Sequence, residues 1–216
     1  KAKWVKADLR CPNVLKDYLQ NTDLLLQFAA TTSGAKDIVQ RPYLHVTDNA
    51  VMNSYLLRES FEAGVKHFIF PSCTVMLQSK EFQNENDWQP NIEIHKNYYG
   101  VGNTKVYIEK MCKFYSELGL KTTAIRHSNV FGPHDKFDPG LSHVFASVIM
   151  KTGTKNETVD VWGDGSEGRD FLFITDLTDL FAILIRDQKV PFELLCAGSS
   201  KLTPIKSLYE MVLEER

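Results

Sequence analysis

The sequence has few of the features that would point to a membrane, a nucleic acid or a repeat architecture. No apolar run approaches the ~18 residues that a transmembrane helix needs. The formal net charge of −2 gives no bulk attraction to nucleic acid or to an anionic membrane surface. No internal repeat, low-complexity stretch or block of like charge interrupts the chain. We therefore expect neither a membrane nor a nucleic acid among its partners.

Cysteines are few and scattered. The four are Cys11, Cys73, Cys112 and Cys196, and no two of them form a C-x-x-C pair. This spacing indicates neither a disulfide framework nor a zinc site, so no metal is expected. A reducing compartment fits this usage, and no signal-peptide pattern occurs at the N-terminus. A cytoplasmic location is the resulting expectation.

The remaining composition is that of an ordinary globular protein. Of 216 residues, 43% are hydrophobic and 24% charged, which is enough for one domain with a sizeable core and a small additional lobe. Both ends are abrupt, because Lys1 leads directly into a strand-like segment and residues 207–216 stop within a helical pattern. We expect this chain to be part of a longer protein.

Apolar runs typical of strands buried on both faces alternate with segments of helical periodicity. The sequence predicts strands over residues 3–9, 23–30, 65–70, 157–165, 168–174 and 192–198, and a further strand that runs from residue 121 into a loop. It predicts helices over residues 12–20, 41–63, 101–118, 142–151 and 176–186, the last capped by Thr175 or Asp176, and a long loop over 74–97. This alternation is typical of an α/β fold with a doubly wound parallel sheet.

In such sheets ligands bind beyond the carboxyl ends of the strands. The residues at these ends are Asp8, Ala29–Ala30, Ser72–Thr74 and His127–Asn129. Small residues at 29–30 would let a flat cofactor approach the backbone, although tight packing of strand on helix is the commoner reason for them. A hydroxyl of Ser72 or Thr74 could bind a substrate oxygen, although a serine that forms a turn is equally familiar.

Four further residues have both a functional and a structural interpretation. Lys105, in a helix, could bind ribose hydroxyls and lower the pKa of a nearby phenol, or be a solvated surface group. His143 could be a general acid or could simply begin a helix. Trp162 offers a stacking surface and Arg169 a fork for a diphosphate, although a hairpin with a surface arginine has the same pattern.

Taken in order, these segments resemble the extended short-chain dehydrogenase/reductases, the NAD-dependent epimerase/dehydratase family that acts on nucleotide sugars. The segments that carry the resemblance are "NVFGPHDKFDP", "SHV", "VWGDG" and "RDFL", and they are most similar to the GDP-fucose synthase-like branch. The resemblance implies a Rossmann-like fold with NAD or NADP as cofactor. Residues 1–133 would form a truncated dinucleotide-binding domain. Residues 134–216 would form mostly a substrate-binding lobe, with some elements returning to the main sheet.

The resemblance also implies a role for each position. Asp8 and Leu9 would flank the adenine, Ala29 and Ala30 would line the cofactor cleft, Lys105 would hold the nicotinamide ribose, and His127 and Asn129 would lie beside the nicotinamide and the sugar. His143 would be an acid, Cys73 lies near the place of an epimerisation thiol, and Asn129, Val144, Lys151, Trp162 and Arg169 would surround the substrate. The family's glycine-rich phosphate loop would lie before Lys1.

One departure concerns the family's catalytic pair, a tyrosine followed four residues later by a lysine. Four residues before Lys105 stands Val101, whereas Tyr99 and Tyr98 are six and seven residues away. Six residues along a helix turn a side chain by about 120°, and seven return it near the same face. Gly100, Gly102 and Asn103 favour an irregular helix start. Either tyrosine, Tyr99 or Tyr98, or a water held by Lys105 and Thr74, could then donate the proton.

The leading hypothesis is an NAD(P)-dependent oxidoreductase or epimerase acting at C4 of a nucleotide sugar, with a GDP-sugar favoured, in sugar or polysaccharide biosynthesis. A dehydratase is less favoured because "SCTVM" offers no acidic residue. The alternative from another class is a catalytically impaired homologue that binds a nucleotide sugar or cofactor. The family resemblance further implies a homodimer or higher homo-oligomer, formed through the helices over 41–63 and 101–118.

Overall fold

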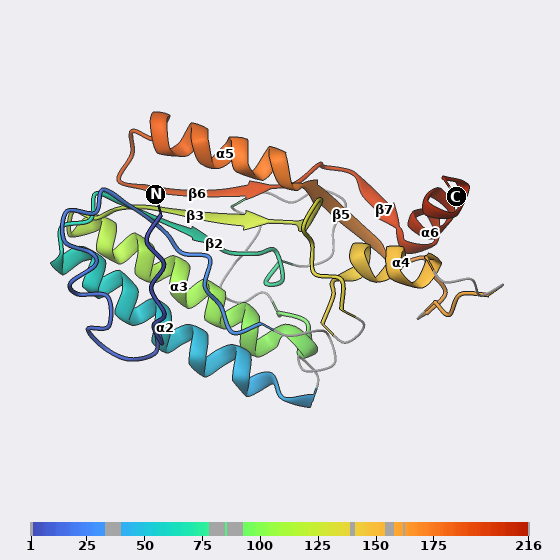
Figure 1. Cartoon of the computed structure of the whole chain (residues 1–216), viewed down its shortest axis with the longest axis horizontal. Coiled ribbons are helices and arrows are strands. Elements are labelled where there is room, and N and C mark those ends of the chain that lie inside the picture. The colour runs from blue at the N-terminus through green and yellow to red at the C-terminus, as the bar shows by residue number, and fades with distance from the viewer. Residues whose placement is uncertain are drawn as a thin grey trace.

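A four-stranded parallel sheet forms the centre of the computed structural model (Figure 1), which describes residues 2–32, 40–77, 85, 93–138, 141–153, 158–161 and 163–215. Its strands are β1 (Leu24–Leu26), β2 (His67–Pro71), β3 (Lys121–His127) and β6 (Phe192–Ala197). They lie in the order β1-β2-β3-β6, and each neighbouring pair is parallel. All four carboxyl ends therefore meet at one edge of the sheet.

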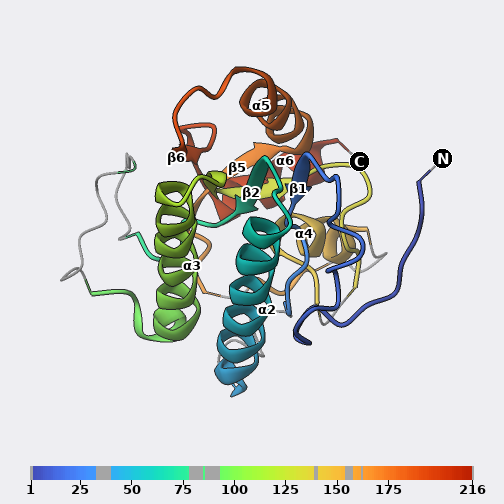
Figure 2. The ribbon, with the colours of Figure 1, turned by 90° about the vertical axis from the view of Figure 1, so that its left-hand side faces the viewer.

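Helices cover both faces of this sheet. Helices α2 (Pro42–Glu62) and α3 (Tyr99–Glu117) lie side by side on one face, and α5 (Ile174–Asp187) lies on the other (Figure 2). The side chains of β2 alternate between the two faces of the sheet, which explains why Phe68, Ile69 and Phe70 are all apolar. Phe68 and Phe70 face α2 and α3, whereas Ile69 joins a second cluster with Leu177 and Phe181 of α5. The predicted doubly wound parallel sheet is confirmed.

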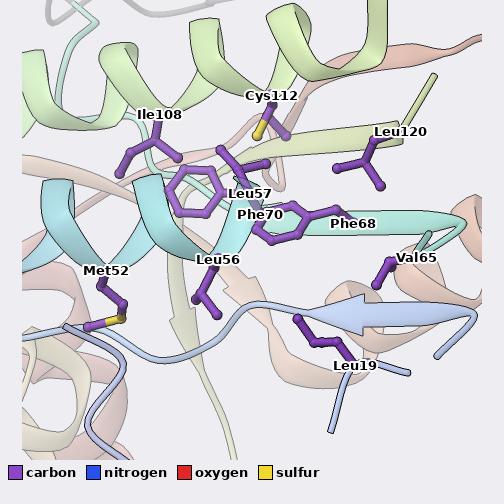
Figure 3. Close-up of a cluster of buried hydrophobic side chains, with 11 residues drawn as sticks. Leu19, Met52, Leu56, Leu57, Val65, Phe68, Phe70, Ile108, Cys112 and Leu120 are labelled. Atoms are coloured by element: carbon purple, nitrogen blue, oxygen red, sulfur yellow. The ribbon is translucent and has the colours of Figure 1, made fainter. Parts of the chain in front are cut away.

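The larger core cluster lies between the sheet and the paired helices (Figure 3). Leu57 of α2 and Ile108 and Cys112 of α3 close over the rings of Phe68 and Phe70, and all five side chains are at most 3% exposed. Burying a large apolar side chain contributes about 1.5–3 kcal/mol each. This cluster fixes α3, and with it the polar side chains at the start of that helix, relative to the end of β2.

A second sheet lies beyond the main one. It consists of β4 (Asn129–Phe131), β5 (Gly168–Phe173) and β7 (Leu202–Pro204), with β4 parallel and β7 antiparallel to β5. Helices α4 (Val144–Thr152) and α6 (Ile205–Glu214) pack beside it around Val148, Leu208 and Tyr209. The chain returns to the main sheet through α5 and β6. The division predicted at residue 133 stays a prediction.

The N-terminal segments differ from the prediction. Residues 3–9 form no strand, because no described strand lies alongside to accept their backbone hydrogen bonds. Residues 12–20 form successive turns instead of a helix, and Asn13 and Asn21 adopt positive φ angles of 62° and 61° at either end. The apolar periodicity there serves packing, since Leu19 is 4% exposed within the main core cluster.

Other differences lie in the C-terminal part. The described residues of 157–165 form no strand, and Gly163 and Gly165 turn the chain at φ 75° and 76°. Helix α5 begins after Phe173 without any side-chain cap, so the cap predicted at Thr175 or Asp176 is wrong; Asp176 lies in the first turn. Strands β4 and β7 were not predicted, because three residues are too few for a pattern; β4 lies in the segment predicted as a loop.

The remaining segments agree with the prediction to within a few residues at each end. A short 3-10 helix, η1 (Lys96–Tyr98), precedes α3, which begins two residues earlier than expected. The rest of the loop predicted over 74–97 lies largely outside the described residues. Among the helices that the structure describes, none is long and apolar enough to cross a membrane.

Candidate functional site

The end of β2 and the first turns of α3 meet at the carboxyl edge of the sheet. Lys105 lies half-buried on α3, and its Nζ donates a hydrogen bond to the carbonyl oxygen of Pro71 at 3.3 Å. The same ammonium lies 4.6 Å from the centroid of the Phe70 ring, within the range of a cation–π contact. The helix thus delivers a positive charge directly above the last residues of β2.

Two histidines join Lys105 from other elements. His127 ends β3, and its Nδ1 donates to the carbonyl oxygen of Ser128 at 2.8 Å. Burial is the largest effect and lowers the pKa of His127, the hydrogen bond to Ser128 opposes this shift, and the charge of Lys105 lowers the pKa further. The ring is therefore neutral at pH 7, with Nε2 as an acceptor. His143 stands at the N-terminus of α4, where its side chain forms no cap.

Cys73 completes the group. Its half-buried thiol follows Ser72, and burial raises the pKa of the Cys73 thiol against the opposing charge of Lys105. The thiol is consequently protonated at neutral pH, able to give a proton but not poised to take one. The structure thus brings together four of the predicted site residues: Lys105, Cys73, His127 and His143. Thr74, also half-buried, follows directly in the same turn.

Ser72 has a different environment. Its hydroxyl is 1% exposed and donates to Glu109 Oε1 at 2.6 Å, so it points into the protein beneath the site. Glu109 in turn forms a buried ion pair with Arg126, whose Nη2 lies 2.7 Å from Glu109 Oε2. Of the two hydroxyls predicted at this strand end, only that of Thr74 lies outside this network.

The two candidate tyrosines lie on different sides of α3. Tyr99 is 64% exposed and lines a surface hollow with Tyr43 and Val46 of α2. Tyr98 is half-buried and packs against Met76 and Ile94. Met76 lies in the turn that follows β2, and Ile94 lies in the segment that leads into α3. The two tyrosines thus have different surroundings, and the choice between Tyr98 and Tyr99 as proton donor stays a prediction.

The loop after β1 carries Ala29 and Ala30, both exposed. The side chain of buried Gln27 brackets Ala29: its Nε2 donates to the Ala29 carbonyl at 3.1 Å, and its Oε1 accepts from the Ala29 amide at 3.2 Å. Asn49 of α2 brackets Thr31 in the same way, at 3.0 Å in each direction. The backbone of Ala29 and of Thr31 is thus fixed by buried polar side chains, while the small side chains of Ala29 and Ala30 stay exposed.

Gln27 and Asn49 were missed by the sequence analysis. Their signal was available, since His45, Asn49 and Asn53 recur at intervals of four on the face of α2 that lies against the core. Polar residues on a buried helix face need partners. Asn53 meets this need through Gln27, whose Nε2 donates to Asn53 Oδ1 at 3.1 Å.

The predicted adenine-side residues lie in the N-terminal segment. The Asp8 carboxylate accepts three hydrogen bonds from Arg10, which lower the pKa of Asp8 to about 2. Arg10 also reaches Asp48 of α2 at 3.1 Å. The Leu9 side chain packs against the main core cluster, so only its backbone can face a ligand.

The predicted substrate-side residues spread over the second sheet. Asn129 donates from Nδ2 to the Asp170 carbonyl at 3.0 Å, and Lys151 donates from Nζ to the Asp160 carbonyl at 2.9 Å. Arg169 is exposed on β5, and Val144 packs against the α4–α6 cluster. Trp162 lies outside the described residues. Within the described part of the chain, no group of three His, Cys, Asp or Glu side chains could hold a metal ion.

Comparison with known proteins shows the family of the chain. Residues 1–194 match the sequence model of the NAD dependent epimerase/dehydratase family. The dTDP-4-dehydro-6-deoxy-D-allose reductase of Streptomyces bikiniensis is 27% identical over 195 residues, covering 88% of this chain and 58% of that protein. The GDP-L-fucose synthase of Sinorhizobium fredii is 25% identical over 193 residues, covering 84% and 60%.

A solved structure shares the fold. The Thermus thermophilus UDP-glucose 4-epimerase complex with NAD superposes with a TM-score of 0.75 at 19% identity, over 96% of this chain and 67% of that one. The chain spans about three fifths of the length of the curated relatives it matches. The predicted nicotinamide cofactor is confirmed at the level of the family, whose description is NAD dependent. The chain belongs to the NAD dependent epimerase/dehydratase family.

Proposed function

We propose that this chain is part of an NAD(P)-dependent oxidoreductase or epimerase that acts at C4 of a nucleotide sugar, with a GDP-sugar as the favoured class, in sugar or polysaccharide biosynthesis. The observation that carries the proposal is the convergence of Lys105, Cys73, His127 and His143 at the carboxyl edge of the parallel sheet. The relatives named as a dTDP-sugar reductase and a GDP-L-fucose synthase support the substrate class.

The residues at this edge fit a nicotinamide cofactor. Lys105 carries three N–H donors, and its hydrogen bond to the Pro71 carbonyl is long at 3.3 Å, so ribose hydroxyls can compete for the ammonium. The exposed Ala29 and Ala30, held by Gln27, leave room for a flat ring against the backbone. Asp8 would accept from the adenine amine, and Leu9 would contribute its backbone. When bound, the nicotinamide accepts or supplies a hydride.

The chain's own residues would orient the sugar and manage its protons. The Thr74 hydroxyl is the strand-end group that would bind the C4 oxygen, since Ser72 is engaged with Glu109. The proton at that oxygen would come from Tyr98 or from a water held by Lys105 and Thr74. Holding the reacting atoms in line accounts for much of such a rate enhancement, which explains how the reaction proceeds without the family's usual tyrosine.

Epimerisation at a neighbouring carbon would need a second proton donor. Cys73 is protonated at neutral pH because burial raises its pKa, and His143 begins α4 without capping it. Asn129 and neutral His127 would each form hydrogen bonds with oxygens of the sugar. Val144, Lys151, Trp162 and Arg169 would surround the nucleotide and its diphosphate, with the Arg169 guanidinium as the bidentate donor.

The outer faces of α2 and α3 support a homodimer. Tyr43, Tyr99, Tyr107, Phe114 and Leu118 are each more than 40% exposed on or next to these neighbouring helices. An apolar surface of this kind is typical of a face that binds another protein. Two such pairs of helices, one from each subunit, would form a four-helix bundle.

A catalytically impaired, ligand-binding homologue is the second candidate. It is favoured by one observation, that Val101 stands four residues before Lys105, in the place of the family's tyrosine. The two candidates differ in whether the complete protein turns over a nucleotide sugar.

The test begins with the complete natural protein. It would be purified, denatured, and any released nucleotide identified by mass spectrometry. Release of NAD(H), NADP(H) or a GDP-sugar supports a working cleft and names the ligand for turnover assays. If no nucleotide is released and none of these ligands binds when it is added back, both candidates are rejected.

A further inference from the structure

Beneath the candidate site lies a buried polar network that the proposed reaction does not use. Glu109 of α3 is at its centre. It accepts from Ser72 Oγ at 2.6 Å, from Arg126 Nε at 3.1 Å and from Arg126 Nη2 at 2.7 Å. Glu109, Ser72 and Arg126 are 4%, 1% and 2% exposed in that order. The network therefore joins the end of β2, the middle of α3 and the end of β3.

Each member of the network is a close neighbour of a predicted active-site residue. Ser72 directly precedes Cys73, and Arg126 directly precedes His127. Glu109 follows Lys105 by four residues, so the two side chains lie on one face of α3. The side chains of adjacent strand residues point to opposite sides, so fixing Arg126 toward α3 turns His127 away from it.

The network extends to two more elements. Arg126 Nη1 donates to the Glu85 carbonyl at 3.1 Å, and the Cys196 amide of β6 donates to Glu85 Oε1 at 2.5 Å. Arg126 thus meets three acceptors through its fixed, planar fork, which a lysine could not reproduce. Its charge is neutralised by Glu109 at the same time.

We propose that Ser72, Glu109 and Arg126 are positioning residues, which hold the Cys73–Thr74 turn, Lys105 and His127 in one arrangement from beneath. Ser72 is then not the hydroxyl that binds the sugar. This role rests on the proposed function for its catalytic meaning, but the geometry that it describes is independent of the substrate.

Electrostatics agree with close contact between the network and the site. The Glu109 carboxylate raises the pKa of the Cys73 thiol and Arg126 lowers it, both in addition to the larger effects of burial and of Lys105. A buried ion pair seldom adds net stability over apolar side chains of the same volume. The Glu109–Arg126 ion pair is therefore better explained by its effect on the positions of neighbouring groups than by its contribution to stability.

The test follows Cys73 alkylation by iodoacetamide in the complete protein, with each cysteine quantified by mass spectrometry. A buried thiol reacts through opening of its surroundings. Ser72→Ala removes one hydrogen bond that closes the turn, so Cys73 should react about fivefold faster.

The matched control is Thr122→Val, which also removes one buried hydroxyl bond, that of Thr122 Oγ1 to the Cys112 carbonyl at 2.8 Å. It lies at the opposite end of β3. Thr122→Val should leave the Cys73 rate unchanged while fully buried Cys112 reacts faster. A Cys73 rate that is unchanged in Ser72→Ala, or that rises equally in both variants, would overturn the proposal.

A second measurement tests the charges. Glu109→Gln removes the carboxylate that raises the pKa of Cys73, so the midpoint of the pH profile of alkylation should move to lower pH. An unmoved midpoint would contradict contact between network and site. Binding of NADH and of NADPH by the wild-type protein is measured in parallel. The absence of binding to both would reject the proposed function, whereas the alkylation results would still decide the positioning role.

Discussion

The two ends of the main sheet both contain buried polar networks, yet they differ in what they leave available. At the amino end, His67 Nε2 donates to Thr123 Oγ1 at 2.7 Å, and the Thr123 hydroxyl donates to Gln188. Gln188 Nε2 then reaches the carbonyls of Thr122 and Val190, both at 3.0 Å. This network consists of uncharged hydrogen-bonding groups that serve one another, and it joins β2, β3 and the end of α5.

At the carboxyl end, the buried part is charged and a second layer of groups lies above it. Glu109 and Arg126 neutralise each other, while Lys105, His127 and Cys73 remain partly accessible. Buried polarity alone therefore does not identify a site. What distinguishes the carboxyl edge is that fixed groups support others that still have donors and acceptors to offer a ligand.

The largest effect on the free energy of unfolding is expected from a variant that breaks the Glu109–Arg126 ion pair. Glu109→Leu leaves the Arg126 guanidinium buried without its partner, which should cost about 3–5 kcal/mol of unfolding free energy. Urea denaturation measures this loss. Adding Arg126→Met should restore much of it, because two apolar side chains can fill the same volume. If the double variant is no more stable than Glu109→Leu, the loss comes from packing and not from the unpaired charge.

The next effect concerns the accessible layer. Lys105→Ala should lower turnover about 100-fold or more, because it removes the group that would hold the ribose and assist proton transfer. Thermal unfolding should change little. Lys113→Ala, an exposed lysine on the same helix, is the control and should retain full turnover. Equal activity of the two variants would exclude Lys105 from the chemistry.

The amino-end network should respond to pH. Burial, together with the charge of Lys121, lowers the pKa of His67 to about 4 from an ordinary value near 6.5. The unfolded chain therefore binds a proton first, so stability is full above about pH 6.5 and falls as the pH drops toward 4. The loss should be about 2 kcal/mol between about pH 7 and about pH 5. In His67→Gln this part of the pH dependence of unfolding should disappear, and an unaltered slope would contradict it.

The smallest expected effect is a change in turnover that distinguishes the role of Tyr98 from that of Tyr99. Tyr98→Phe should lower turnover about tenfold if its phenol supplies the proton, whereas Tyr99→Phe should leave turnover unchanged. Steady-state kinetics at saturating cofactor measure both. A loss confined to Tyr99→Phe would instead identify Tyr99 as the donor, and no loss in either variant would favour the water held by Lys105 and Thr74.

The sequence predicted the layers of the fold better than their edges. The apolar run Phe68–Phe70 carries its own evidence, because all three side chains are buried and the strand has helices on both faces. Residues 12–20 misled because spaced leucines pack equally well in turns. Residues 3–9 misled because a strand depends on a neighbour that local sequence does not reveal.

Within the site, position along the chain indicated Lys105, Cys73, His127 and His143, since each follows a strand or lies near the start of a helix at the same edge. Ser72 could not be separated from Thr74, because the partner that turns its hydroxyl inward lies 37 residues away on Glu109. The choice between Tyr98 and Tyr99 depended in the same way on where α3 begins.

The parallel order of the main sheet also has a consequence for how the chain acquires its structure. Each of its strand pairs needs a long crossover, and Thr122 of β3 must wait for Phe192 of β6. Loop closure of this length slows folding. Ser72, Glu109 and Arg126 all precede α5 and β6 in the sequence, so their hydrogen bonds can form before the ribosome has made these two elements. The amino-end network, in contrast, needs Gln188 at the end of α5. During synthesis, therefore, the Ser72–Glu109–Arg126 part of the carboxyl-end network can form before the amino-end network, and only its link through Glu85 to Cys196 waits for β6.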